Sequence, residues 1–478
     1  MENQTANETR QQAARGRRLI ATMLAGILIA AALLGVTLSA SSDNTLFSPV
    51  AAEAVLEGDD LTALRARSVQ IKWDILSPTA GEIRLNLFDD LSLTAEHVRT
   101  EQPVTGGFVW IGAVVGEANS TVTLSVKDGA LAGSVHRFGR EGFTIQPAAD
   151  AGESGMLPGL YTILELDPGA AEPSGQDFVV PEPPEAFDLP NTAGETCQED
   201  GSVIDLMVVY TPAARDATGG QAAIEALINQ RIAEMNTANA ISQVNFAWQL
   251  VNAAEVAYVE SGDLGADLEA LQDPADGLMD EVHALRDAHQ ADLVALLIDE
   301  GSDMSCGIAY QMLELDAWFS GYGFGVSALD YPGAPFCSGL TLAHEIGHNM
   351  GNSHDQANST DVSLSPYSFG YQSPNQTFRT LMAYDCPDGC ERINQWANPD
   401  VWYAGEPTGV DFDTDPVAAA DIARSMNDAR IQTANFRANC EAPPPTETPV
   451  PENTPQPTPT PLNPKLMDNG LYLPVVVE

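Results

Sequence analysis

The chain has 478 residues, a length that predicts two or three domains, each able to bury its own core. It carries 67 Asp and Glu residues against 21 Lys and Arg residues, and its net charge is −46. Such a charge argues against nucleic acid as a partner, because surfaces that bind nucleic acid are basic.

The N-terminal segment has the features of an export signal. Residues 1–18 are polar and contain several arginines, and residues 19–42 carry no charge. We expect residues 1–18 to stay in the cytoplasm and residues 19–42 to be either a signal peptide, cleaved near Ala40, or an uncleaved membrane anchor. In both cases the rest of the chain is predicted to be extracellular, secreted or attached to the cell surface. Contact with the membrane is then expected only through such an anchor.

Residues 43–167 alternate apolar and polar side chains. The alternation is clearest at residues 69–75 and 122–126. This period of two predicts a β-rich domain of six or seven strands. Residues 168–196 contain many Pro, Gly, Ala and acidic residues with little periodicity, and they predict a linker between domains.

Residues 197–440 predict a mixed fold, α+β or α/β, because segments with the pattern of strands alternate with segments with the pattern of helices. The apolar runs Val203–Tyr210 and Ala291–Ile298 are typical of buried strands. Apolar residues of Gln221–Ala240 recur at helical spacing and predict a long amphipathic helix. We therefore expect a mixed, twisted sheet with flanking helices.

The segment TLAHEIGHNMGNSHD, residues 341–355, contains three of the seven histidines of the chain. On a helix, His344 and His348 project from the same face and can bind one metal ion. Gly351 can take a positive φ, end the helix and turn the chain back, so that His354 becomes a third ligand. Three protein ligands leave the fourth position for water, which is the arrangement of a catalytic zinc site.

Glu345 lies between two of these histidines in the sequence and is expected to face the same cavity. A carboxylate at this place would take a proton from water activated by one zinc ion (Zn2+). A helix with ordinary surface histidines is the alternative, but chance seldom produces the full spacing H-E-x-x-H-x-x-G-x-x-H.

This spacing resembles that of the metzincin metalloendopeptidases, and Asp355 after the third histidine is similar to the reprolysin (adamalysin) branch of that group. Residues 381–384, LMAY, resemble the Met-turn of these enzymes, in which the methionine, here Met382, lies beneath the metal as an apolar floor. The resemblance implies that Asp355 orients the turn after the third ligand. It also implies one of two roles for Tyr384, either stabilising the transition state or packing near the floor.

Residues 386–399 are similar to the wall of the substrate pocket in bacterial reprolysin-like enzymes, including the peptidyl-Asp metalloendopeptidases. Within this wall, Arg392 either meets an acidic side chain of a substrate or pairs with a carboxylate of the protein itself. Residues 321–329 resemble the edge strand that borders the cleft and pairs with an extended substrate. The resemblance covers residues 200–440 and implies a monomeric zinc endopeptidase that acts on proteins or peptides.

Several alternatives accompany this interpretation. The domain could serve as a non-catalytic surface binding or adhesion protein, although Glu345 is often lost from such relatives. The β-rich segment precedes a protease-like domain, as the pro-segment of a zymogen does, and a permanent accessory domain is its alternative. A structural calcium ion (Ca2+) would suit the many aspartates, but the sequence contains no EF-hand or repeat-type calcium loop.

The chain contains six cysteines, and an even count in an exported protein predicts three disulfides. We expect the pairs Cys306–Cys337, Cys386–Cys390 and Cys197–Cys440. Cys197 could instead supply a thiolate to the metal of a precursor, the cysteine switch of some metzincins. Residues 441–464 are rich in Pro and Thr and predict an extended stalk, and residues 465–478 form a C-terminal tail.

Overall fold

The computed structural model describes residues 44–50, 63–137, 142–149, 156–167, 175, 177–183, 198–302, 305–330, 337–359 and 363–438. The predicted cytoplasmic tail, export segment, stalk and C-terminal tail therefore lie outside the described residues. Within the described part of the chain, no helix is both long and apolar enough to cross a lipid bilayer.

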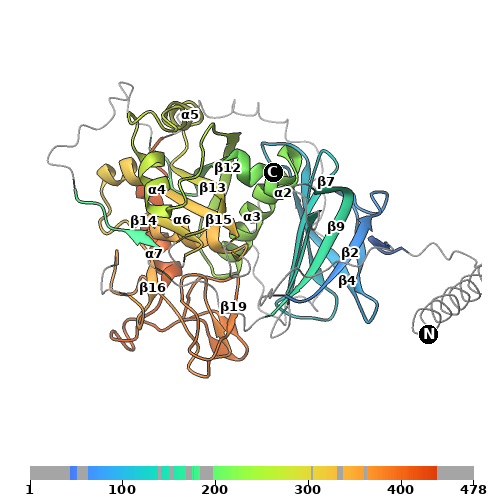
Figure 1. Ribbon diagram of the computed structural model, residues 1–478. Helices are drawn as coiled ribbons and strands as arrows, with labels where there is room; N and C mark the ends of the chain where they lie inside the picture. The colour runs from blue at the N-terminus through green and yellow to red at the C-terminus, as the bar shows by residue number, and fades with distance from the viewer. Residues whose placement is uncertain are drawn as a thin grey trace, which may run out of the picture. The chain divides into compact units, whose positions relative to one another are not determined.

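The β-rich segment forms one nine-stranded antiparallel sheet in the order β1-β2-β9-β8-β7-β6-β5-β4-β3 (Figure 1). Its first strand also reaches the last one in this order, because the backbone N–H of Leu46 donates to the carbonyl of Arg84 at 2.8 Å. The sheet thereby closes on itself around an apolar core. The strands are β1 (Phe47–Pro49), β2 (Ala63–Ile71), β3 (Glu82–Phe88), β4 (Leu91–Glu101), β5 (Phe108–Val114), β6 (Thr121–Lys127), β7 (Ala130–His136), β8 (Phe143–Ala149) and β9 (Met156–Leu166).

Alternation of side chains explains why this segment is a sheet. In β6, Val122 and Leu124 are fully buried, and the turn to β7 is made by Asp128 and Gly129, both with positive φ. Two residues with positive φ form the tight turn that matches the twist of paired strands. The prediction of a β-rich domain is confirmed, with nine strands in place of the expected six or seven.

A second sheet, of six strands, has the order β10-β14-β15-β13-β11-β12. Strands β12, β11, β13 and β15 are parallel, and β14 runs antiparallel to β15. Both expected buried strands are present, since β11 has the predicted bounds and β13 overlaps the run that ends at Ile298. The strands are β10 (Phe178–Val179), β11 (Val203–Tyr210), β12 (Ala247–Glu255), β13 (Leu293–Glu300), β14 (Gly307–Tyr310) and β15 (Phe324–Asp330).

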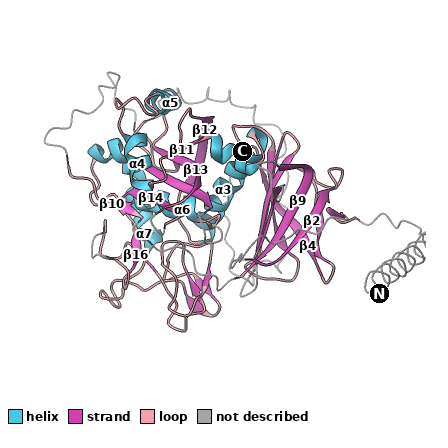
Figure 2. Ribbon diagram, viewed as in Figure 1, coloured by secondary structure: helices cyan, strands magenta, loops and turns pink. Residues whose placement is uncertain are grey.

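One expectation about this sheet is wrong. Residues 321–329 were predicted to form the edge strand, but β15 is hydrogen-bonded on both sides, to β13 and to β14. The short β14 follows β15 in the sheet, and the outermost strand on this side is β10, from the predicted linker, which pairs with β14 in parallel (Figure 2). A four-residue strand that follows a turn carries too little periodicity to be recognised from sequence.

Helices flank the six-stranded sheet, as predicted (Figure 2). The pattern of Leu264–Gln290 predicts helix with a break near Pro274, and the structure has two helices there, separated by a segment that contains Pro274. The helices are α2 (Pro212–Thr218), α3 (Gln221–Ile241), α4 (Leu264–Gln272), α5 (Glu281–His289), the 3₁₀ helix η1 (Ala317–Tyr322), α6 (Thr341–Asn349) and α7 (Ile422–Thr433). Short two- or three-residue strands complete the C-terminal region: β16 (Ser353–Asp355), β17 (Phe369–Gly370), β18 (Phe378–Arg379), β19 (Glu391–Arg392), β20 (Trp402–Tyr403) and β21 (Glu406–Pro407).

Helix α3 differs from the expected amphipathic helix because its polar face is buried too. Asn229 and Glu234 are buried in the contact between α3 and the nine-stranded sheet. Thr105 of the β-rich segment donates to Asn229 at 2.8 Å, and Ser134 donates to Glu234. The polar face thus contacts a distant part of the chain, which no local pattern can reveal.

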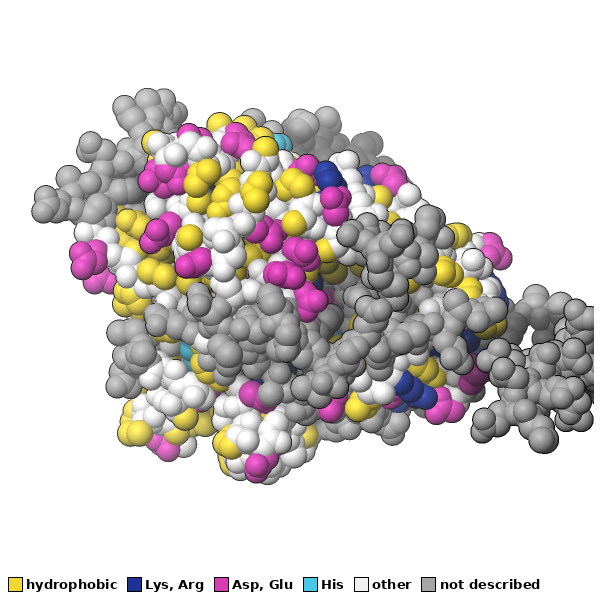
Figure 3. Space-filling model, viewed as in Figure 1, with side chains coloured by type: hydrophobic (Ala, Val, Ile, Leu, Met, Phe, Trp, Pro, Cys, Tyr) yellow, Lys and Arg dark blue, Asp and Glu magenta, His cyan; other side chains and the backbone are white. Residues whose placement is uncertain are grey.

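Two of the three expected disulfides are confirmed. Cys306 is bonded to Cys337, and Cys386 to Cys390. Cys197 and Cys440 lie outside the described residues. On the outside of the molecule, acidic side chains are scattered over the face seen in Figure 3, as the charge of −46 leads one to expect.

Candidate metal centre

Helix α6 and the turn after it bring three histidines together. The helix ends at Asn349, and Gly351 follows with φ of 84°. A side chain at this glycine would collide with Leu364, because an added Cβ would lie 2.6 Å from the Cβ of Leu364. The chain then turns back into β16, which carries His354.

The three imidazoles of His344, His348 and His354 face one another. Their ring centroids are 4.9 to 5.3 Å apart, and all three side chains are buried. Backbone carbonyls hold two of the rings through Nδ1, with Leu381 O 2.9 Å from His344 and Asn352 O 2.9 Å from His348. The Nε2 atoms are thereby left to point into the space between the rings.

The chemistry of this group fits a metal ion. Nε2 of His348 is buried and has no hydrogen-bond partner among the described residues. Burial lowers the pKa of His344 to about 3 and also lowers the pKa of His348, so both rings are neutral, the form that binds a metal. An unpartnered buried nitrogen is costly unless a ligand uses its lone pair.

A fourth side chain, that of Asp177, joins the histidines. Its carboxylate oxygens lie 3.1 Å from Nε2 of His344, 3.6 Å from that of His348 and 2.8 Å from that of His354. The four ligand atoms lie within 4.8 Å of one another. Burial opposes ionisation of Asp177, but the charge of His354 and hydrogen bonds from the three imidazoles hold its pKa well below the usual range.

Sequence reasoning missed Asp177. It lies in the segment interpreted as a linker, 167 residues before His344, among many other acidic residues. No spacing rule connects it to the histidine motif. The short apolar run Phe178–Val180 after it was the one available signal, and three residues are too few for a strand prediction.

Glu345 lies beside the histidines and is almost completely buried, with 2% of its surface exposed. Burial raises its pKa well above the usual value, the negative charge of Asp177 raises it further, and Arg392 opposes both effects. Its Oε2 has no hydrogen-bond partner in the described part of the chain. Gly307 of β14 packs against this carboxyl group so closely that an added Cβ would lie 2.4 Å from Oε1.

Met382 lies beneath α6 and is fully buried. A Cβ added at Gly347, in the middle of α6, would lie 2.4 Å from the Met382 sulfur. The helix therefore passes directly over the sulfur, between the two histidines that it carries. The role of Met382 as an apolar floor beneath the metal stays a prediction.

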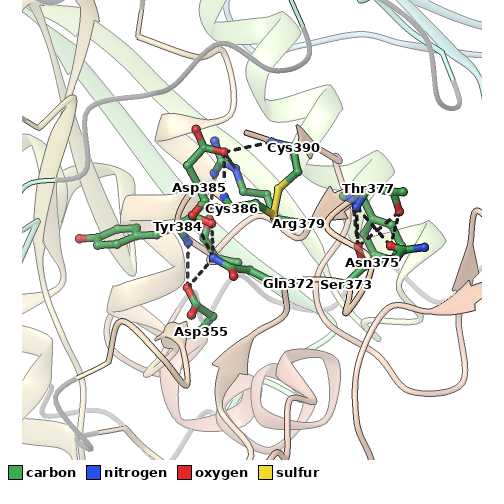
Figure 4. Close-up of a disulfide and its surroundings, with 12 residues drawn as sticks. Asp355, Gln372, Ser373, Asn375, Thr377, Arg379, Tyr384, Asp385, Cys386 and Cys390 are labelled. Atoms are coloured by element: carbon green, nitrogen blue, oxygen red, sulfur yellow. Dashed lines mark hydrogen bonds and ion pairs between the residues drawn. A yellow bond between two sulfur atoms is a disulfide. The ribbon is translucent and has the colours of Figure 1, made fainter. Parts of the chain in front are cut away.

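Tyr384 lies against His354, with ring centroids 3.9 Å apart. Its hydroxyl donates to the carbonyl of Gly175 at 2.6 Å, and its backbone N–H donates to Asp355 at 3.1 Å (Figure 4). Asp355 also accepts from the backbone of Ala357 at 3.1 Å, so it braces the turn after His354 and ties that turn to the loop after Met382.

A cavity adjoins the metal-binding group on the side of the Cys386–Cys390 loop. Arg392 holds its guanidinium at the wall of this cavity by donating twice to Leu381 O, at 3.1 and 2.7 Å, and it lies 2.9 Å from Nδ1 of His344. Arg379 lies near Asp385, seen beside the disulfide in Figure 4. The residues lining the cavity include Asp177, Gly307, Glu345, Arg379, Tyr384 and Arg392.

Comparison with known proteins agrees with this geometry. Residues 200–397 match the family model Reprolysin_5, metallo-peptidase family M12. A peptidyl-Asp metalloendopeptidase of Xanthomonas campestris is 28% identical over 442 residues, which is 88% of this chain and 97% of the relative. A peptidyl-Asp metalloendopeptidase of Stenotrophomonas maltophilia is 34% identical over 245 residues, which is 49% of this chain and 53% of the relative.

Among solved structures, metalloproteinase-II from Bacteroides fragilis overlaps 62% of this chain and 88% of its own, with 14% identity and a TM-score of 0.35. That overlap is too weak to bear on the site, whereas the family match spans α6, Met382 and the cavity wall up to residue 397. These matches support a metzincin-type bacterial metalloendopeptidase, and the part of the chain similar to peptidase family M12 is residues 200–397.

Proposed function

We propose that the protein is an exported zinc endopeptidase in which His344, His348 and His354 hold the metal and Glu345 is the general base. The observation that carries this proposal is the convergence of three buried imidazoles, one of them unpartnered at Nε2, beside a buried carboxyl group. Three imidazole nitrogens are the donor set of some catalytic zinc sites.

Zinc bound by this set would lower the pKa of water and polarise the carbonyl of the bond to be cleaved. Glu345 accepts the proton of that water and then donates it to the leaving nitrogen. The raised pKa of Glu345 suits this role, because a base that returns its proton must hold it for part of the cycle. Leu381 and Asn352 fix the imidazoles through their carbonyls, and Asp355 fixes the turn.

The test of this function is Glu345→Gln beside His348→Ala. We expect Glu345→Gln to retain one zinc per chain and the melting temperature, and to lose at least about a hundredfold in the rate of casein cleavage. His348→Ala should lose zinc as well, which separates the base from the ligands. If Glu345→Gln kept full activity, the assignment of the base would be wrong. Absence of cleavage by the metal-loaded wild-type enzyme from which residues 43–167 have been removed would favour an adhesion protein.

The same proposal includes the class of substrate. Relatives of this chain are named peptidyl-Asp metalloendopeptidases, and we propose that this enzyme also cleaves beside acidic residues. Supporting this, Arg392 brings a positive charge to the wall of the cavity that adjoins Glu345. Arg379 contributes less, because Asp385 lies 3.6 Å away and offsets its charge.

Matched peptides test this specificity. The enzyme should cleave a peptide with Asp beside the scissile bond at least about tenfold better, in kcat/KM, than the same peptide with Asn, and Arg392→Gln should abolish that difference. The Asn peptide is the internal control for damage to the active site. If Arg392→Gln lowered both rates equally, Arg392 would support the fold of the wall and would not select the substrate.

We also propose that residues 43–167 are the pro-segment of a zymogen and that residues 19–42 direct export. The contact of the nine-stranded sheet with α3, and the two disulfides of the catalytic region, support this arrangement. Mass spectrometry of the protein from culture medium tests it. The mature N-terminus should fall after residue 167, and a mature protein that begins near residue 43 would make the β-rich segment a permanent domain.

A further inference from the structure

Two arginines and an aspartate, namely Arg379, Arg392 and Asp385, line the cavity beside the metal centre. We propose that Asp385 is a specificity-determining residue, which limits how strongly this cavity prefers an acidic side chain of the substrate by compensating the charge of Arg379. The inference rests on the proposed preference for acidic residues and adds the residue that sets its strength.

The two arginines lie side by side on paired strands. Strands β18 and β19 run parallel, and Arg379 is the register partner of Arg392. Like charges at opposed positions of a strand pair destabilise it. Arg379 is also buried, with 3% of its surface exposed, and a buried charge needs a compensating one. The arginine pair therefore requires an anion, either from the protein or from a ligand.

Asp385 supplies one such anion. Its Oδ1 lies 3.6 Å from Nε of Arg379, and Nη1 of the same arginine donates to the carbonyl of Ala383 at 2.8 Å. Arg392 donates to the carbonyl of Leu381, a contact that fixes its guanidinium but does not change its charge. Asp385 thus offsets the charge of the buried arginine, and an acidic side chain of the substrate would meet Arg392.

The carboxylate of Asp385 is fixed at this place (Figure 4). Its Oδ1 accepts from the backbone N–H groups of Cys386 at 2.9 Å and Cys390 at 3.3 Å, the two ends of the disulfide loop. Gln372 donates to the backbone carbonyl of Asp385 at 3.1 Å and to that of Tyr384 at 2.8 Å. An amide oxygen could accept the same two N–H groups, so the loop requires an acceptor here and not a charge. The charge acts instead on Arg379 and on the substrate that the cavity selects.

The test is the ratio of kcat/KM for two matched peptides, one with Asp and one with Asn beside the scissile bond, measured on the active enzyme recovered from culture medium. Asp385→Asn keeps the shape and the acceptor of the side chain but removes its charge. We expect it to raise the Asp-to-Asn ratio at least about fivefold, because Arg379 then lacks this counter-charge in the cavity that holds the substrate carboxylate.

Two further variants and a control complete the test. Arg379→Gln should lower the ratio, since it leaves the negative charge of Asp385 in the cavity, and the double variant should return to the ratio of the wild type. The control is Asp388→Asn, which removes an exposed aspartate from the same disulfide loop and should change the ratio less than about twofold. If Arg379→Gln does not fold, the comparison of the two aspartate variants still decides.

Salt, zinc content and melting temperature separate the possible failures. The effect of Asp385→Asn should become smaller at about 1 M NaCl, because salt screens charges. An effect that salt leaves unchanged would count against the inference, because it would indicate a changed shape of the cavity. A folded, zinc-loaded Asp385→Asn enzyme with the ratio of the wild type would overturn the inference, and so would an equal rise in Asp388→Asn. A wild-type enzyme that cleaves both peptides equally well would refute the proposed preference for acidic residues and this inference with it. Loss of the zinc site itself would be seen as a wild-type protein that binds no zinc and cleaves neither peptide.

Discussion

Gly307 offers a way to move the proposed base without touching it. An added Cβ at this position would lie 2.4 Å from Oε1 of Glu345 and 2.6 Å from its Cδ. Gly307 does not have a positive φ, so the backbone itself accepts alanine. The substitution Gly307→Ala should therefore act on the Glu345 carboxyl group and leave the course of β14 unchanged.

The size of the effect follows from the size of the clash. Oε1 has to retreat from 2.4 Å to the 3.4 Å of an ordinary contact, which displaces the carboxyl group by about 1 Å. A displacement of about 1 Å in a catalytic group can cost about a hundredfold in rate, or about 2.7 kcal/mol in the activation barrier. Crowding of the core should also lower the free energy of unfolding by about 1–3 kcal/mol.

The assay is steady-state cleavage of a fluorogenic peptide by the mature enzyme, with zinc content and melting temperature measured on the same samples. We expect kcat to fall about a hundredfold while zinc stays bound. The matched control is Gly325→Ala on the neighbouring strand, because its Cβ would lie 3.4 Å from the Cβ of Glu345, an ordinary contact, and its tightest contact would be 3.3 Å, to the Cβ of Ala309. An unchanged kcat in a folded, zinc-loaded Gly307→Ala protein would refute the reasoning that the position of this carboxyl group limits the rate.

Three more predictions concern other parts of the molecule. In the mature enzyme, Tyr384→Phe should lower kcat at least about tenfold if the hydroxyl stabilises the transition state, and unchanged turnover would leave the ring only a packing role. Burial lowers the pKa of His136, but its hydrogen bond to Glu234 and the charge of that residue outweigh burial and leave the pKa raised. The stabilisation from this pair should thus be present below about pH 6.5 and be lost as pH rises through the folded-state pKa of His136. Urea unfolding at pH 5.5 and pH 8.5 tests this. The substitution His136→Ala should lower the free energy of unfolding only at the lower pH. Replacing Cys306 and Cys337 by serine should lower the free energy of unfolding by about 3.5 kcal/mol, as expected for a loop with 31 residues of separation, and a loss near zero would show that the unfolded chain is already constrained.

The periodicity of apolar residues predicted individual strands and helices correctly. The strand Val203–Tyr210 and the helix that begins at Gln221 are present because their apolar residues recur at the right period. The convergence of the histidines was predictable too, since a four-residue step and a glycine turn place all three within fifteen consecutive residues.

Contacts between distant segments were not predictable in this way. Asp177 reaches His344 across 167 residues, and nothing in the composition of its segment separates it from other aspartates. The place of β14 between β10 and β15 is likewise a property of how distant segments meet. A single sequence indicates which secondary structure each segment prefers, but it does not indicate which distant segment will pack against it.

The buried polar face of α3 determines what is uncovered if the nine-stranded sheet departs. The described apolar cluster at this contact is small and consists of Val109, Ile111 and Ala233, whereas Asn229 and Glu234 meet their partners through hydrogen bonds. Water can replace those partners at little cost, but it cannot replace apolar ones. The polar face of α3 can therefore be covered by the sheet or exposed to water. After release of the sheet, the exposed surface of α3 would be polar and would present no large apolar patch. Release would then not promote aggregation of the catalytic region.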